Sequence, residues 1–303
     1  MKALRIYLMP LVASLMLLTA CDLQQEVELD LPEYEPLLVV ESYLQPGNPY
    51  IVTLIESSDF YGDIQINFVR DAEVVISHNG INDTLVPFEI PLDFAFPPGF
   101  VDTTLLQQLG PILGEGAYIY TSLNQVPEDY NSEFKLSVKA PDGRSLSANT
   151  FIPAPVEADS IIVRFNEDSL ALMLTQFQDD PNQANFYRRI LERRVVDTIV
   201  SETGDTTFNY RSRTEQDFFT DDEISNGELI TFGTLFEYER GDSLINTIYH
   251  VTEDYSRFVE TRDAAIIASF SPFAPPTVVF SNIEGGLGIF TGFTFTERLT
   301  VIE

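Results

Sequence analysis

The chain has one cysteine, Cys21, and its surroundings are those of a residue that receives a lipid. It closes the tetrapeptide Leu18-Thr19-Ala20-Cys21, in which small residues precede the cysteine as a signal peptidase requires. Basic Lys2 and Arg5 and the apolar run 7–18 lie upstream, so we predict a signal peptide over residues 1–20. The Cys21 thiol would then be the nucleophile that takes up diacylglycerol and become the N-terminus of a lipoprotein.

Two other interpretations of this segment are weaker. An ordinary secretory signal would leave the position of Cys21 to chance, and a membrane-spanning helix needs about 20 apolar residues, more than the run 7–18 provides. A single cysteine also leaves no partner for a disulfide. We therefore expect a chain held at a membrane by its lipid, which fits a Gram-negative envelope.

A second group of residues matches the nucleophile block of a family of lipases and esterases, namely Gly241-Asp242-Ser243-Leu244. In those hydrolases an aspartate and a histidine near the C-terminus activate the serine, because the imidazole must accept its proton. Neither His78 nor His250 has an aspartate three residues before it, and the block lies late in a β-rich region. We predict a surface turn here and assign no catalytic residue.

Oxygen ligands for a hard cation are concentrated in one part of the chain. Asp217, Asp221, Asp222 and Glu223 precede an Asn-Gly turn, and residues 179–182 add further acids. Neither stretch has EF-hand spacing, so a solvated acidic turn is the alternative to calcium. Two histidines and one cysteine cannot assemble a zinc site, and we expect no other cofactor.

The charge balance excludes several classes of partner. Without residues 1–20 the chain keeps 15 basic and 47 acidic residues, so nucleic acid and anionic lipid surfaces should repel it. Hydrophobic residues still make up 44% of the sequence, and 23 phenylalanines and 13 tyrosines are enough for a sizeable core. The chain should fold, and its length suits two β domains.

Turn residues divide the first half of the chain into short runs rich in β-branched and aromatic residues. An acidic tether is expected over 21–36, and an immunoglobulin-like β-sandwich over 37–152. Its predicted strands are 37–42, 50–56, 72–77, 84–89, 118–122, 133–139 and 145–152.

The run 153–156 contains two prolines, which cannot donate to a sheet, so we place a domain boundary there. A second β-rich domain is expected over 153–303, which makes the fold mainly β with one short helix. The helix should begin near Thr252, whose hydroxyl would cap it. The predicted strands are 160–166, 170–177, 186–200 and 208–213, followed by a final strand near the C-terminus. One face of this final strand should carry Leu287, Ile289, Phe293, Phe295, Leu299 and Val301.

One long apolar insertion, residues 91–116, interrupts the first domain. Connections of this length are uncommon inside a domain and are often functional. It is either a lid folded over the sandwich or an exposed docking loop for a partner, in which case the contact residues would be Phe94, Phe96, Phe100 and Val101.

The block 281–290, Ser-Asn-Ile-Glu-Gly-Gly-Leu-Gly-Ile-Phe, resembles a signature of a known family. Further matching positions are the segments 39–42, 71–74 and 219–222 and Tyr255. Over nearly the whole mature chain, the sequence resembles Bacteroidota outer-membrane lipoproteins that are classed as a domain of unknown function. The resemblance implies a companion of a TonB-dependent outer-membrane transporter, facing the cell surface in many relatives. It supplies no catalytic residues.

Bacteroidota also attach O-glycans where an aspartate precedes Ser or Thr and an apolar residue or threonine follows. The chain resembles that pattern at seven positions, some of which we expect to be buried, since such pairs are also ordinary turn residues. They are Thr84, Thr103, Ser160, Ser169, Thr198, Thr206 and Ser243.

Three functional hypotheses follow. The leading one is a non-enzymatic accessory or ligand-capturing lipoprotein that acts beside a TonB-dependent barrel or another envelope protein. A surface hydrolase of glycans or peptides is the second, and it would need convergent carboxylates in a cleft. A structural subunit of an envelope complex is the third.

Overall fold

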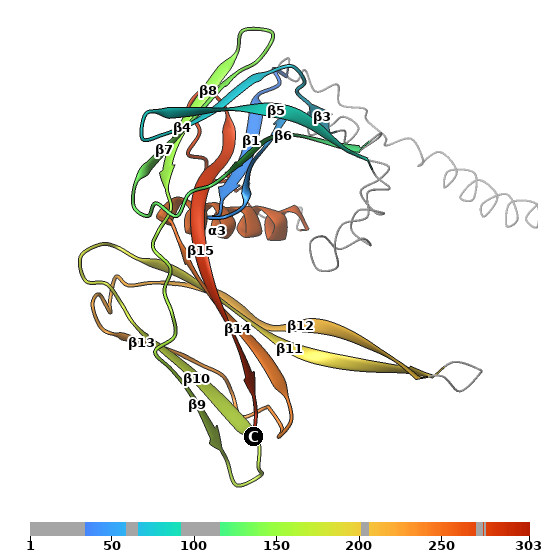
Figure 1. The fold of residues 1–303 in the computed structure, drawn as a ribbon, viewed down its shortest axis with the longest axis vertical. Helices are drawn as coiled ribbons and strands as arrows, with labels where there is room; N and C mark the ends of the chain where they lie inside the picture. Colours follow the sequence, from blue (N-terminus) through green and yellow to red (C-terminus); the bar gives the residue numbers. More distant parts are fainter. Residues whose placement is uncertain (1–33, 59–65, 92–115, 201–205, 271–274, 276) are drawn as a thin grey trace, which may run out of the picture. The chain divides into compact units, whose positions relative to one another are not determined.

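Strands dominate because apolar residues recur at every second position in much of the chain. In β7 (Glu133–Lys139), for instance, Phe134, Leu136 and Val138 are buried and the residues between them are exposed. The computed structural model describes residues 34–58, 66–91, 116–200, 206–270, 275 and 277–303 (Figure 1). Residues Pro36–Glu303 form one unit, and the description below is of this unit.

The first strands are β1 (Leu38–Leu44), β2 (Pro49–Glu56), β3 (Asn67–Phe68), β4 (Glu73–His78), β5 (Ile81–Pro91), β6 (Gly116–Gln125), β7 and β8 (Ser145–Phe151). The remaining elements are β9 (Ser160–Phe165), β10 (Ala171–Gln178), β11 (Phe186–Val200), β12 (Thr206–Asp221), β13 (Leu229–Gly233), β14 (Ser243–Val251), α3 (Glu253–Ser269) and β15 (Leu287–Val301). The predicted mainly β fold with one helix is confirmed for the described residues.

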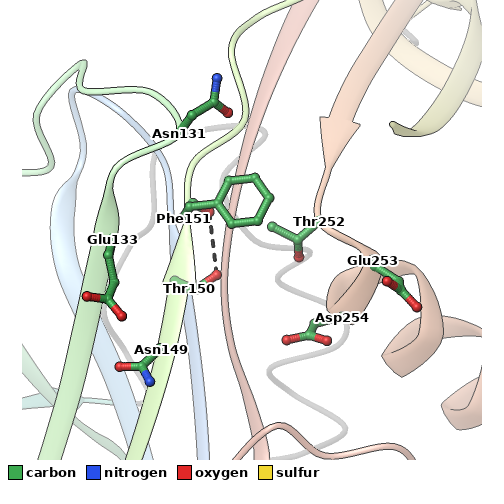
Figure 2. A pocket seen from close by; sticks show the side chains of 8 residues that line it. All are labelled: Asn131, Glu133, Asn149, Thr150, Phe151, Thr252, Glu253 and Asp254. Carbon is green, nitrogen blue, oxygen red and sulfur yellow. Dashed lines mark hydrogen bonds between the residues drawn. The ribbon is translucent and has the colours of Figure 1, made fainter. Parts of the chain in front are cut away.

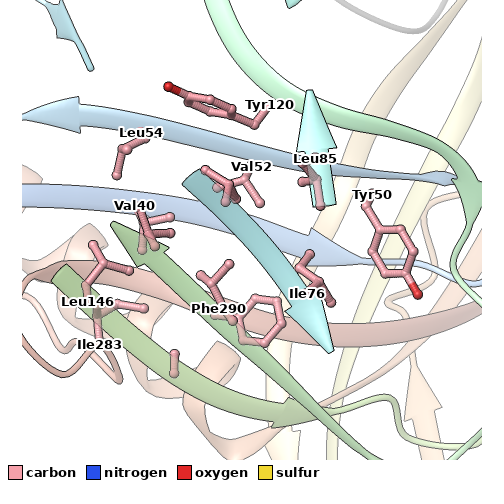
Figure 3. Packing of buried hydrophobic residues seen from close by; sticks show 14 of the residues in the cluster. Val40, Tyr50, Val52, Leu54, Ile76, Leu85, Tyr120, Leu146, Ile283 and Phe290 are labelled. Atoms are coloured by element: carbon pink, nitrogen blue, oxygen red, sulfur yellow. The ribbon is translucent and has the colours of Figure 1, made fainter. Parts of the chain in front are cut away.

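The N-terminal sandwich forms because β5 passes from one sheet to the other. Its first residues pair with β4 and its last with β6, so the path β1-β2-β6-β5 continues into β4-β7-β8. Side chains from both layers meet in one apolar core, part of which Figure 3 shows. Its fully buried members include Val40, Leu54, Ile76, Phe134 and Leu136.

A second sandwich follows from residue 156 onward. The layer β12-β11-β14-β15 packs against the three-stranded sheet β13-β10-β9. Two apolar clusters fill the space between them, one around Met173, Leu191 and Leu244 and the other around Phe177 and Ile248.

The last strand, β15, belongs to both sandwiches (Figure 1). Its residues 287–292 pair in parallel with β1, and its residues 293–301 pair antiparallel with β14. Ile283 and Phe290 from this C-terminal region are part of the N-terminal core. The boundary expected at residue 153 therefore stays a prediction, since the first sandwich uses a strand from beyond it.

Glycines bring β15 close to β1. A Cβ atom on Gly288 would lie 1.9 Å from the carbonyl oxygen of Val40, and Gly288 has a φ of +112°. Gly285 and Gly286 would meet the carbonyl oxygens of Ser145 and Leu38 at 2.5 and 2.7 Å. The glycine-rich block enters a strand, as expected, and its small residues let three segments pack backbone to backbone.

Helix α3 begins as predicted, because the Thr252 hydroxyl accepts a hydrogen bond from the Tyr255 amide. Phe258 and Val259 are buried against Ile289 of β15. The face of β15 that was expected to be apolar is covered by α3 only in part, and four of its residues are at least 38% exposed, namely Leu287, Phe295, Leu299 and Val301. Within the described ranges no helix is long and apolar enough to cross a membrane.

The proline-containing crossover after β8 is fixed along β14 and β15. Thr294 and Thr296 donate from their hydroxyls to the carbonyl oxygens of Pro153 and Val156, at 3.1 and 2.6 Å. Nδ1 of His250 lies 2.7 Å from the carbonyl oxygen of Ala154. These bonds satisfy carbonyl groups that no neighbouring strand pairs with.

Candidate functional site

A pocket of about 440 Å³ lies where β7 and β8 approach the start of α3 (Figure 2). Two segments from the β7-β8 hairpin and one distant segment at the start of α3 form its walls. The lining residues are Asn131, Glu133, Asn149, Thr150, Phe151, Thr252, Glu253 and Asp254, which we call the acidic pocket.

The strand side of the acidic pocket is set by the pairing of β7 with β8. Glu133 pairs with Phe151, which places both at the same end of the two strands. Asn131 adopts a φ of +59°, and its amide donates to the carbonyl oxygen of Ile152 at 2.8 Å. Glu133 also forms an ion pair of 3.0 Å with exposed Lys135.

The helix side is set by the cap of α3. Thr252 directly follows the last residue of β14 and is the N-cap of α3, so Glu253 and Asp254 occupy the first turn. The positive end of the helix dipole stabilises carboxylates at these positions. Asp254 Oδ2 accepts from Asn282 Nδ2 at 2.9 Å, and the same amide group donates to the carbonyl oxygen of Phe290 at 2.8 Å.

This arrangement offers mostly hydrogen-bond acceptors. Three carboxylates and two carboxamides surround the pocket, and Phe151 beside them is 41% exposed. Figure 2 shows Glu133 on the strand side and Asp254 on the helix side. Such a set suits a ligand with amino or hydroxyl donors and one apolar face that can stack on a ring.

Sequence reasoning did not find this site. Glu133, Glu253 and Asp254 carry no motif, and only the tertiary contact between α3 and the end of β7 and β8 brings them together. The family-like block supplied an indirect signal, because its Asn282 holds Asp254.

The residues proposed for calcium have separate roles. Asp217 accepts two hydrogen bonds from Arg188, at 2.8 and 2.6 Å, and buried Asp222 accepts from the amide of Asn185 at 2.9 Å. Asp221 accepts from the Glu223 amide at 3.2 Å in a turn. Among the described residues no group of three or more acidic, histidine or cysteine side chains is placed to hold a metal ion.

The predicted surface turn is right only for Gly241 and Asp242, because Ser243 and Leu244 are the first residues of β14 and Leu244 is fully buried. Gly241 has a φ of +95°, and the Asp242 carboxylate accepts from the Glu239 amide at 2.9 Å. His78 lies 3.0 Å from Asp129 and stacks on Phe134. Since His250 is held by the crossover, each histidine has a structural contact of its own.

The structure describes the side chains of four of the seven expected O-glycosylation sites. Thr84 and Ser169 are exposed and Ser160 and Ser243 are half-buried, so none of these four is fully buried. Thr103 lies outside the described residues, and the side chains of Thr198 and Thr206 are not described. Cys21 and the docking-loop residues also lie outside the described residues, namely Phe94, Phe96, Phe100 and Val101.

A second surface feature surrounds Arg188 on the outer face of β11. Its guanidinium lies over the rings of Phe219 and Tyr249, at 5.2 and 5.9 Å, and donates to the Tyr255 hydroxyl at 2.9 Å. Tyr249 also contacts the ring of Phe295 on β15 at 5.3 Å. An aromatic surface thus continues into the exposed apolar face of β15.

Comparison with known proteins establishes the family. The family model described as DUF4249, a domain of unknown function, matches residues 24–298. The chain therefore belongs to the DUF4249 family. A search of curated proteins found no match.

Two solved structures show weak similarity. A chain of a cytokine receptor complex has a TM-score of 0.22 and 10% identity, over 70% of this chain and 82% of that one. A DUF4785 family protein from Legionella pneumophila subsp. pneumophila str. Philadelphia 1 has a TM-score of 0.24 and 11% identity, over 70% of this chain and 52% of that one. This chain thus spans about half of the Legionella protein. Neither similarity carries an argument about function.

Proposed function

We propose that this DUF4249 protein is a lipid-anchored accessory protein of the Bacteroidota outer membrane that captures a ligand beside a TonB-dependent transporter. The proposed anchor is Cys21, which follows a signal sequence and a short tether. The aromatic and apolar outer face of β11, β14 and β15 is a candidate contact for the transporter, together with the insertion 91–116.

The observation that carries the ligand-capture role is the acidic pocket. Its volume of about 440 Å³ is within the range of small-molecule sites. Glu133 comes from a strand pair, and Asp254 is held by Asn282. Fixed acceptors lose little conformational freedom on binding, which favours affinity.

The test is a binding screen of the full-length protein in detergent, by calorimetry, against amino sugars, neutral oligosaccharides and short basic peptides. For a ligand that binds, Glu133→Gln and Asp254→Asn should each weaken affinity about tenfold, as expected for the loss of a charged hydrogen bond. Glu223→Gln is the matched control, since Glu223 is exposed and is not part of the pocket. Equal affinity in all three variants would place the binding site elsewhere.

The anchor and the partner need separate tests. Cys21→Ala should move the protein from the membrane fraction to the soluble fraction, and complete retention in the membrane would contradict the lipoprotein assignment. A pull-down of the tagged protein in mild detergent should recover a TonB-dependent barrel in near-equal amount. Recovery of the protein alone would favour an independent binder, and a ligand-free stable complex with other proteins would favour a structural subunit.

A hydrolase of glycans or peptides is the second candidate, because Glu133 and Asp254 approach the acidic pocket from different elements (Figure 2). Two carboxylates around one pocket are the minimum for acid and base roles in glycoside hydrolysis. Turnover of an identified ligand that is abolished by Glu133→Gln would establish this activity, and binding without turnover would support capture alone.

A further inference from the structure

A charged residue is enclosed in the core of the second sandwich. Arg189 on β11 is 0% exposed, and its side chain points inward like those of Tyr187 and Leu191 on either side. Leu191 belongs to one of the two apolar clusters of this sandwich, and Tyr187 belongs to the other. Arg189 therefore lies between them.

Two further polar residues also lie between the two clusters, one on the facing sheet and one on the strand next to β11. On β10 of the facing sheet, Thr175 lies between Met173 of the first cluster and Phe177 of the second. On β14, Asn246 likewise lies between Leu244 of the first cluster and Ile248 of the second. Thr175 and Asn246 are 0% and 1% exposed. We call Thr175, Arg189 and Asn246 the Arg189 layer.

Within the part of the chain that the structure describes, the hydrogen-bond partners of the Arg189 guanidinium are neutral. Nε donates to Asn246 Oδ1 at 2.8 Å, and Nη1 donates to Gln216 Oε1. Within the described residues, Arg189 Nη2, Asn246 Nδ2 and Thr175 Oγ1 are buried without any hydrogen-bond partner. The layer thus combines one unpaired positive charge with three groups that are able to donate.

Burial lowers the pKa of Arg189 to about 10, so the side chain is still a cation at neutral pH. A buried charge is costly unless a counter-charge and hydrogen bonds accompany it. A water molecule could accept from the guanidinium and donate to Thr175 Oγ1, but it would leave the positive charge without a counter-charge. An anion accepts from all three donors and neutralises the guanidinium.

We propose that the Arg189 layer binds a small monovalent anion of the size of chloride between the sheets of the second sandwich. A cavity of about 110 Å³ beside the crossover is lined in part by Asn246, so it borders one of the three residues of the layer. Ionisable residues at this cavity are Glu157, Glu297 and Arg298. This inference is independent of the proposed function at the acidic pocket.

The first test measures thermal unfolding of the full-length protein in detergent at fixed ionic strength, while chloride replaces gluconate. Fixed ionic strength is necessary because the net charge of −30 makes stability sensitive to salt in general. A ligand that binds the folded state raises Tm with its concentration, so Tm should rise with chloride and with bromide but not with gluconate. An equal Tm in all three salts would overturn the proposal.

The second test localises the anion. Thr175→Val keeps the side-chain shape but removes one donor, and it should weaken the apparent halide affinity roughly tenfold. Thr247→Val is the matched control, since Thr247 is also buried but adjoins Asn246 on the opposite face of β14. Crystals grown in bromide should show an anomalous peak within hydrogen-bond distance of Arg189 Nη2. A water molecule in that place, or unchanged halide dependence in Thr175→Val, would refute the site.

Discussion

Replacing Gly288 by alanine should destabilise the protein far more than the same change at Gly80. Both glycines have positive φ angles, +112° and +77°, so both alanine variants carry a backbone cost of about 1–2 kcal/mol. At Gly80 no heavy atom lies within 4 Å of the added Cβ, and the cost should end there. At Gly288 the Cβ would lie 1.9 Å from the carbonyl oxygen of Val40, so the backbones of β1 and β15 must separate.

The extra cost of that separation follows from what β15 joins. Val40 and Phe290 are 0% exposed, so moving the strands apart disturbs a packed core, and overpacking of this kind costs about 1–3 kcal/mol. Weakening one or two buried backbone hydrogen bonds adds about 1 kcal/mol each. We therefore expect Gly288→Ala to lose about 3–7 kcal/mol in total, against about 1–2 kcal/mol for Gly80→Ala.

Urea unfolding followed by near-ultraviolet circular dichroism is suited to this comparison, because the chain has 13 tyrosines and no tryptophan. The free energy of unfolding is obtained from the midpoint and the slope of each transition. If the two variants lose the same free energy, the close approach of β15 to β1 does not constrain Gly288, and the explanation of the glycine-rich block is wrong.

Three further predictions concern single hydrogen-bonded side chains. Tyr120→Phe should cost about 1–3 kcal/mol in urea unfolding, because its hydroxyl serves both an amide and a carbonyl group, at 2.9 and 2.8 Å. Asn282→Ala should release Asp254, so amide hydrogen exchange should increase in the first turn of α3 and change little in β7. An equal increase of exchange in both elements would show that the substitution only lowers global stability. Burial lowers the pKa of His250 from 6.5, so the unfolded state takes up the proton more readily and stability falls as the pH drops below 6.5. His250→Asn retains a donor but no titration, and it should lose less stability than the wild type between pH 7 and pH 5 in the same assay.

The strands could be predicted well where local pattern and pairing agree. The ends of β7 and β11 match the expected ranges, and Thr252 caps α3 as its hydroxyl suggested. Turn residues such as Asn79-Gly80 adopt positive φ angles between β4 and β5. In these places a few neighbouring residues determine the structure.

Long-range pairing could not be predicted in the same way. Nothing local indicates that residue 288 pairs with residue 40, or that the start of α3 meets the end of β8. The acidic residues near 217–223 illustrate the same limit. The sequence places them together, but Asp217 pairs with Arg188 on the adjacent strand, and Asp222 bonds with Asn185 in a separate buried network.

Because β15 pairs with strands of both sandwiches, it affects the order in which the chain can fold. A nascent or exported chain emerges from its N-terminus, so β1 is present long before the strand that lies beside it. Until residues 287–292 arrive, one edge of β1 has no partner and the N-terminal core lacks Phe290. Exposed edges of this kind pair readily with other chains. The first sandwich can therefore close only when β15 is available, and a chaperone that shields the edge of β1 would protect the chain until then.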